Sequence, residues 1–160
     1  MGEPDADVLS NVKVLNISTC TFVSFPASGF PKSKKLKSVL IRQMTGLLHI
    51  SAATFPAATN LVIEDINELL IEHNVGQSSL VSIEIRNAVI NELGEDVFKD
   101  VKNLEKLIFQ NVTINSIATN SLNIPNINSK LSVKFLNCKV SNFLTHTSSH
   151  IKERVHQYQC

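Results

Sequence analysis

Hydrophobic residues recur along the chain in a pattern with a period of roughly 24 residues, and residues 80–103 show it most clearly. Counted from Leu80 as position 1, the apolar residues occupy positions 1, 4, 6, 11, 14, 19 and 22, which are Leu80, Ile83, Ile85, Ile90, Leu93, Phe98 and Val101. Positions 4 and 6 alternate with polar neighbours, and this alternation predicts a half-buried strand at the start of the unit.

The same pattern starts again at five other positions. With Leu80 included, the starts at 12, 36, 58, 80, 104 and 130 are separated by 24, 22, 22, 24 and 26 residues. The unit from Leu36 needs a one-residue insertion near Gly46, which brings Leu47 to position 11. A single unit cannot bury its apolar residues alone, so the units are expected to stack around one continuous core.

These starts predict three segments. Residues 1–11 form an N-terminal cap or leader, residues 12–145 the repeats, and residues 146–160 either a C-terminal cap or the start of further repeats. Ile151, Val155 and Tyr158 lie at roughly helical spacing in that last segment. Ser, Thr, Asn and Pro punctuate the segments after each strand, so only residues 94–102 are expected to form a helical turn.

The pattern resembles the leucine-rich repeat superfamily in its 22–26-residue, extracellular-type form. Cys20 and Cys138 occupy position 9, where that family has Asn or Cys, whereas Ala88 departs from it. The resemblance implies a β-rich solenoid, namely a right-handed coil of about six repeats. A parallel sheet would line its concave face, the convex arcs would be mostly irregular, and both cysteines would face the core.

The resemblance also implies that outward side chains of the strands contact a macromolecular partner. Aliphatic residues beside arginines are typical of protein-binding hot spots. The alternative is that β-branched residues simply favour strands and that the charges form a surface ladder of little energetic consequence. The expected binding residues are Leu40, Arg42, Val62, Glu64, Glu84, Arg86, Ile108 and Gln110.

Composition narrows the classes of function. With 43% hydrophobic and 18% charged residues, the chain is expected to fold as one ordered domain. A net charge of +1, without a long run of one sign, disfavours a dedicated nucleic-acid binder, and residues 32–35 are interpreted as a solvated basic loop. The lack of aromatic residues on the expected binding face disfavours carbohydrate and single-stranded nucleic acid. No apolar run reaches the ~20 residues of a membrane span, so no membrane insertion is expected.

No catalytic constellation stands out. The chain has no nucleophile elbow and no glycine-rich phosphate loop. His146, His150, His156 and Cys160 could be drawn as a zinc site, but Thr and Ser after His146 disfavour the helix it needs. We therefore expect neither an enzyme nor a bound cofactor or metal.

Cysteines and sequons bear on the cellular compartment. Cys138 and Cys160 are candidates for a disulfide, with a free tail thiol as an equal alternative. Asn16 and Asn111 lie in glycosylation sequons and give slight support to secretion, with a cytoplasmic location as the alternative. Together these features predict a protein-recognition module, with adhesion or immune recognition as its candidate role and a homo-oligomer as a candidate assembly. The alternative is a structural, self-assembling repeat protein.

Overall fold

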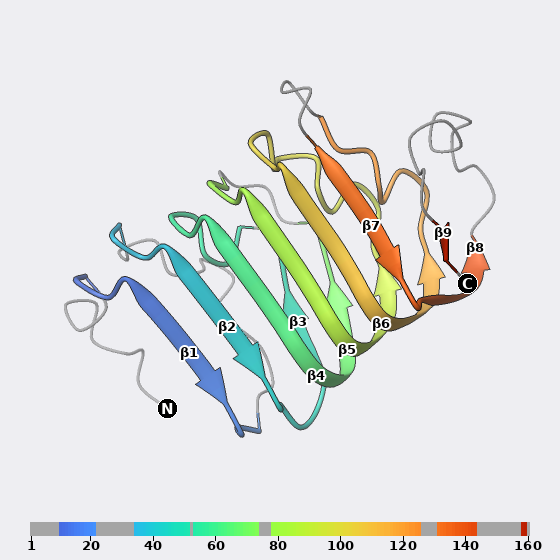
Figure 1. Ribbon diagram of the computed structural model, residues 1–160, viewed down its shortest axis with the longest axis horizontal. Helices are drawn as coiled ribbons and strands as arrows, with labels where there is room; N and C mark the ends of the chain where they lie inside the picture. The colour runs from blue at the N-terminus through green and yellow to red at the C-terminus, as the bar shows by residue number, and fades with distance from the viewer. Residues whose placement is uncertain are drawn as a thin grey trace.

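The chain folds as a parallel-strand β-solenoid of about four turns (Figure 1). The computed structural model describes residues 10–21, 34–51, 53–73, 78–125, 131–143 and 158–159. Every pairing between its strands is parallel, and none of the described residues is helical. The predicted β-rich solenoid of parallel strands is therefore confirmed at this level, whereas the arcs expected to be mostly irregular contain further strands.

Most turns contribute two stretches of strand, whereas the first and the last contribute one each among the described residues. The strands are β1 (Val14–Ser18), β2 (Ser38–Arg42), β3 (Leu48–Ile50), β4 (Asn60–Ile71), β5 (Ser82–Leu93), β6 (Lys106–Ile117), β7 (Ser132–Leu136), β8 (Lys139–Phe143) and β9 (Tyr158–Gln159). The main order is β1-β2-β4-β5-β6-β7-β9, while β3 pairs with β4 and β8 pairs with β6. We call β1, β2, β7 and residues 60–64, 82–86 and 106–110 the first arms. The second arms are β3, β8 and residues 66–71, 88–93 and 112–117.

A residue with left-handed backbone geometry follows each first arm. The φ angles lie between 48° and 56° at Thr19, Gln43, Asp65, Asn87, Asn111 and Asn137. Asn and Asp tolerate this conformation better than other side chains do. The repeated left-handed residue turns the chain from the first arm into the second, so that the two arms enclose the core.

The register of the sheet reproduces the predicted spacing. Val14 pairs with Ser38, Ser38 with Asn60, Asn60 with Ser82, Ser82 with Lys106 and Lys106 with Ser132. Successive partners are 24, 22, 22, 24 and 26 residues apart, the same steps as the hydrophobic pattern. Equivalent positions of neighbouring turns therefore lie side by side, about 4.8 Å apart.

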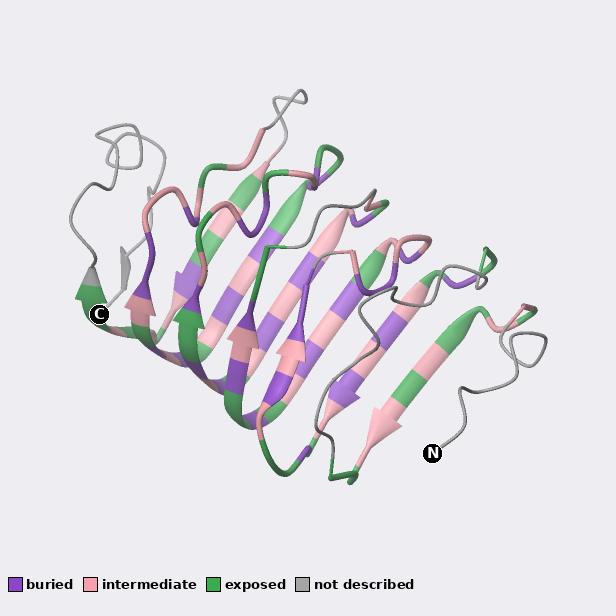
Figure 2. Ribbon diagram, turned by 180° about the vertical axis from the view of Figure 1, so that it is seen from behind, coloured by how far each residue is buried: buried purple, intermediate pink, exposed green. Residues whose placement is uncertain are grey.

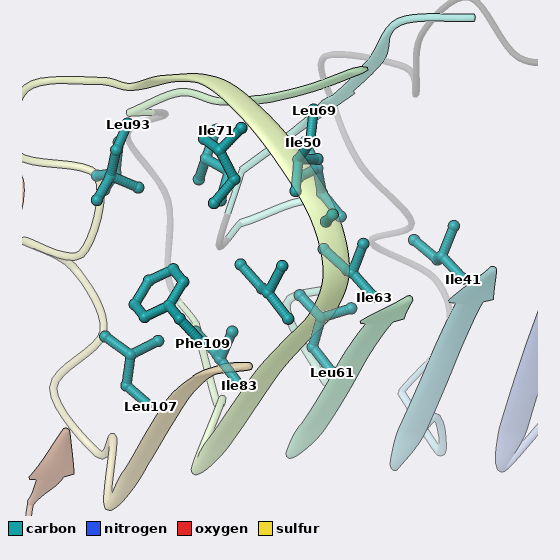
Figure 3. Packing of buried hydrophobic residues seen from close by; sticks show 14 of the residues in the cluster. Ile41, Ile50, Leu61, Ile63, Leu69, Ile71, Ile83, Leu93, Leu107 and Phe109 are labelled. Carbon is teal, nitrogen blue, oxygen red and sulfur yellow. The ribbon is translucent and has the colours of Figure 1, made fainter. Parts of the chain in front are cut away.

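The core lies between the arms, where inward side chains of both meet (Figure 3). Ile41, Ile63, Ile85 and Phe109 of the first arms are at most 1% exposed, and Phe109 stacks on Phe135 at a centroid distance of 4.8 Å. Buried and less buried residues alternate along β2, β4, β5 and β6, as the banded colours of Figure 2 show. Each such side chain stabilises the fold by roughly 2 kcal/mol, which makes the core the main source of stability.

Three expectations about the core need correction. Leu48, fully buried, takes the core position expected for Leu47, because Gly46 absorbs the extra residue with a φ of 89°. Cys20 is exposed rather than in the core, since it follows the end strand β1. Residues 94–102 form turns instead of a helical turn, although Phe98 is buried as expected.

The C-terminal segment is described only at its end. Tyr158 and Gln159 form β9, which pairs in parallel with Phe135 and Leu136 of β7. The helix predicted from the spacing of Tyr158 is therefore wrong at this point. Ile151 and Val155 lie outside the described residues.

Candidate recognition surface

The first arms bring all eight predicted binding residues onto one face. Leu40, Val62, Glu84 and Ile108 are consecutive register partners, and Arg42, Glu64, Arg86 and Gln110 form a second column. Each column alternates along its strands with buried core residues, so both columns point away from the core. We call this outward side of the first arms the front face.

Glu84 is the centre of an ion-pair cluster on the front face. Its carboxylate accepts hydrogen bonds from Lys106 Nζ at 2.5 Å and from Arg86 Nη2, while Arg86 Nη1 lies 4.0 Å from Glu64 Oε2. The Lys106 hydrogen bond, followed by the Arg86 interactions, lowers the pKa of Glu84 against the opposing effect of burial. The carboxylate therefore stays ionised and has its charge balanced inside the chain.

Arg42 differs from Arg86 because no described residue forms an ion pair or hydrogen bond with its guanidinium. Its Nε atom, like that of Arg86, is covered by protein and lacks a hydrogen-bond partner in the described part of the chain. Glu64 is its register partner on β4, but that carboxylate lies near Arg86. Arg42 is thus the cation of the two columns whose charge the described structure leaves unbalanced.

Leu40, Val62 and Ile108 are half-buried rather than fully exposed. Neighbouring side chains cover part of each, as expected for a flat strand surface. Leu40 and Val62 are adjacent across β2 and β4, and both lie next to Arg42 on the same face. The charged residues Glu84, Lys106 and Arg86 separate this pair from Ile108. The apolar part of the front face therefore centres on β2 and β4.

A ladder of amide side chains runs along the corner between the arms. Asn137 Nδ2 donates to Asn111 Oδ1 at 3.3 Å, Asn111 Nδ2 to Asn87 Oδ1 at 3.0 Å, and Asn87 Nδ2 to Asp65 Oδ1 at 3.0 Å. The ladder was not predicted from the sequence. The signal was available, since an Asx residue recurs at the same position of four turns. Lys106 was missed similarly, although repeat counting sets it beside Ser82 and near Glu84.

The structure describes some residues of the predicted modification and metal sites and leaves others outside the described ranges. Asn16 is exposed on β1, whereas the side chain of Asn111 belongs to the amide ladder. Cys138 is a free thiol, so its disulfide with Cys160 is not formed in this structure, and Cys160 itself lies outside the described residues. The zinc cluster drawn from His146, His150 and His156 also lies outside them.

Other surfaces of the described residues offer little for chemistry. A small cavity between the arms is lined by core residues such as Ile63, Ile85 and Phe98, and its lining contains no titratable group. No group of three or more His, Cys, Asp or Glu side chains is arranged to hold a metal ion in the described ranges. Those ranges also contain no helix of the length and apolarity that crossing a membrane requires.

No known protein family, curated protein or solved structure matches this chain. The front face must therefore be interpreted from its own chemistry.

Proposed function

We propose that this chain is a leucine-rich-repeat-type protein of about six repeats that recognises a protein partner through its front face and has no catalytic role. The observation that carries this proposal is the combination of Arg42, whose charge no described residue balances, with the adjacent aliphatic residues Leu40 and Val62. An arginine beside apolar side chains is the composition of a protein-binding hot spot.

The ion-pair cluster holds other charged side chains of the front face in place. Glu84 holds Lys106 and Arg86 by hydrogen bonds, so these side chains have little freedom left to lose when a partner binds. Glu64, Ile108 and Gln110 complete a surface of mixed polarity, which suits the rim of a protein interface. Secretion and a role in adhesion or immune recognition are parts of the same proposal, which requires Asn16, the register partner of Leu40, to carry no glycan.

Affinity capture from native fluid and from cell extract tests this function. The informative variant is Arg42→Glu, because Arg42 has no ion pair within the described structure that the change would break. Lys139→Glu makes the same charge change at an exposed position of the second arms and serves as the matched control. The proposal requires a protein retained by the wild type and by the control but lost with Arg42→Glu. Equal retention by all three would move recognition away from the front face.

A structural, self-assembling role is the second candidate, and the end strand β1 favours it. β1 pairs only with β2 among the described strands, contains no charged residue, and has Val14 67% exposed. Such an edge can accept a further strand. Light scattering of the purified chain decides between the candidates, since self-assembly raises the mass with concentration in the absence of any partner.

A further inference from the structure

The small net charge of the chain conceals a strong separation of charge along the solenoid axis. Residues 8–63 contain six Lys and Arg and no Asp or Glu, whereas residues 64–105 contain ten Asp and Glu against three Lys and Arg. Residues 106–160 return to six Lys and Arg against one acidic residue. Because each turn of a solenoid adjoins only the next, the described residues of these blocks form successive blocks of surface.

Four lysines gather where the first arms of the first two turns begin. Lys13 and Lys37 lie side by side on neighbouring turns, because Lys37 N donates to the Lys13 carbonyl at 2.8 Å. Lys34 and Lys35 precede Lys37 in the same turn, and Lys35 Nζ donates to Asn11 Oδ1 at 2.7 Å. All four side chains are exposed, and none forms an ion pair with a described residue. We call this set the lysine cluster.

Like charges at this spacing repel one another and create a positive potential that attracts anions. The cluster is separate from the two columns of the front face, since Lys13 and Lys37 occupy the position before each first arm. At the equivalent position of later turns stand Thr59, Val81 and Glu105, so the positive charge ends with the second turn.

The surroundings of the cluster decide which anion fits. Two turns span only about 10 Å along the axis. The next turns carry a net charge of −7 over residues 64–105, within about one Debye length, and would repel a long polyanion lying along the solenoid. Residues 10–21 and 34–51 contain no Phe, Tyr or Trp side chain on which bases or sugars could stack. A short run of carboxylates satisfies these limits better than nucleic acid does.

We infer that the lysine cluster is a second docking site, which binds a short acidic segment of a protein partner. It is independent of the front-face proposal, because it uses other residues and a different kind of interaction. The lysine side chains supply charge and single hydrogen bonds to carboxylates, so binding there is strongly dependent on salt.

The test uses a fluorescein-labelled hexaglutamate peptide as the probe and fluorescence anisotropy as the measurement. The wild type should bind it at about 50 mM NaCl and lose most of the affinity at about 300 mM. The double variant Lys13→Gln, Lys37→Gln should bind about fivefold or more weakly. Lys99→Gln with Lys102→Gln, which removes two lysines from the acidic turns, is the matched control and should stay within about twofold of the wild type.

The double variant Lys13→Arg, Lys37→Arg preserves both charges and must therefore retain binding of the peptide. It provides a second test if the glutamine variant folds poorly. Absence of binding at low salt, or equal binding by the glutamine variant, overturns the inference. Tighter binding of a short DNA duplex than of hexaglutamate, lost in the same variant, would assign the cluster to nucleic acid and also overturn it. None of these results depends on Arg42, so a failure of the lysine-cluster inference can be distinguished from a failure of the front-face proposal.

Discussion

The amide ladder at the corner yields a prediction whose size follows from the structure. Asn111 has a φ of 53°, donates to Asn87 and accepts from Asn137. Asn111→Ala places an alanine in the left-handed region at about 1 kcal/mol and removes two exposed hydrogen bonds worth about 0.5 kcal/mol each. The free energy of unfolding should therefore fall by about 2 kcal/mol.

Two further variants separate the causes. Asn111→Gly removes the same hydrogen bonds but tolerates the positive φ, so it should cost about 1 kcal/mol, less than alanine. Asn115→Ala changes an exposed Asn elsewhere on β6 and should stay within about 0.5 kcal/mol of the wild type. Urea unfolding followed by circular dichroism measures all three. Equal destabilisation by Asn111→Gly and Asn111→Ala would contradict a cost of the positive φ, and no difference of either from Asn115→Ala would contradict a contribution of the ladder.

Three other predictions follow from individual side chains. Gln43→Gly should stabilise the fold by about 0.5 kcal/mol in urea unfolding, because Gln43 has a φ of 52° and no side-chain hydrogen bond to a described residue; destabilisation would contradict this. Glu84→Gln should destabilise the chain by about 1 kcal/mol at neutral pH, since the Glu84 carboxylate is 12% exposed and paired with Lys106 and Arg86. The lowered pKa of Glu84 means that this contribution is present above its unfolded pKa and is lost as pH falls through the folded pKa, so wild type and variant should converge in acid. Burial raises the pKa of the Cys138 thiol, so at pH 8 iodoacetamide, monitored by mass spectrometry, should modify Cys138 more slowly than the exposed Cys20; equal rates would refute this.

The architecture was predictable because one physical rule acts on every turn. An apolar residue missing from a core position would leave a gap against the turns on both sides, so the pattern of Leu, Ile, Val and Phe records the register. Ile63, Ile85 and Phe109 show this, since each occupies the same predicted position and is at most 1% exposed. The eight front-face residues follow from the same counting, because the neighbours of core positions in a strand must point outward.

Features that depend on how the turns stack in space were harder to predict from the sequence. The burial of Leu48 in place of Leu47 depends on where a one-residue insertion is absorbed, and hydrophobicity does not distinguish two adjacent leucines. The exposure of Cys20 arises because it follows an end strand, which repeat counting treats like any other. The basic run at residues 32–35 was visible in the sequence, but Lys13 joins these lysines only because it is stacked beside Lys37, which a search for runs of charge does not reveal.

The corner shows why polar positions are harder to interpret than apolar ones. Thr19, Gln43 and Asn87 share the left-handed geometry, yet only Asn87 of these three takes part in the ladder. The backbone conformation requires a residue that tolerates a positive φ, whereas the ladder requires amide or carboxylate groups on successive turns. The first requirement admits several residue types, so the second cannot be deduced from one turn alone.

Site-specific photo-crosslinking tests the central claim, recognition through the front face, most directly. A photoreactive phenylalanine analogue replaces Leu40 on the front face in one protein and the exposed Lys139 on the second arms in another. After irradiation in native fluid or cell extract, our account predicts a discrete protein adduct from position 40 and none of comparable yield from position 139. Adducts of equal yield from both positions, or from position 139 alone, would contradict recognition by the front face.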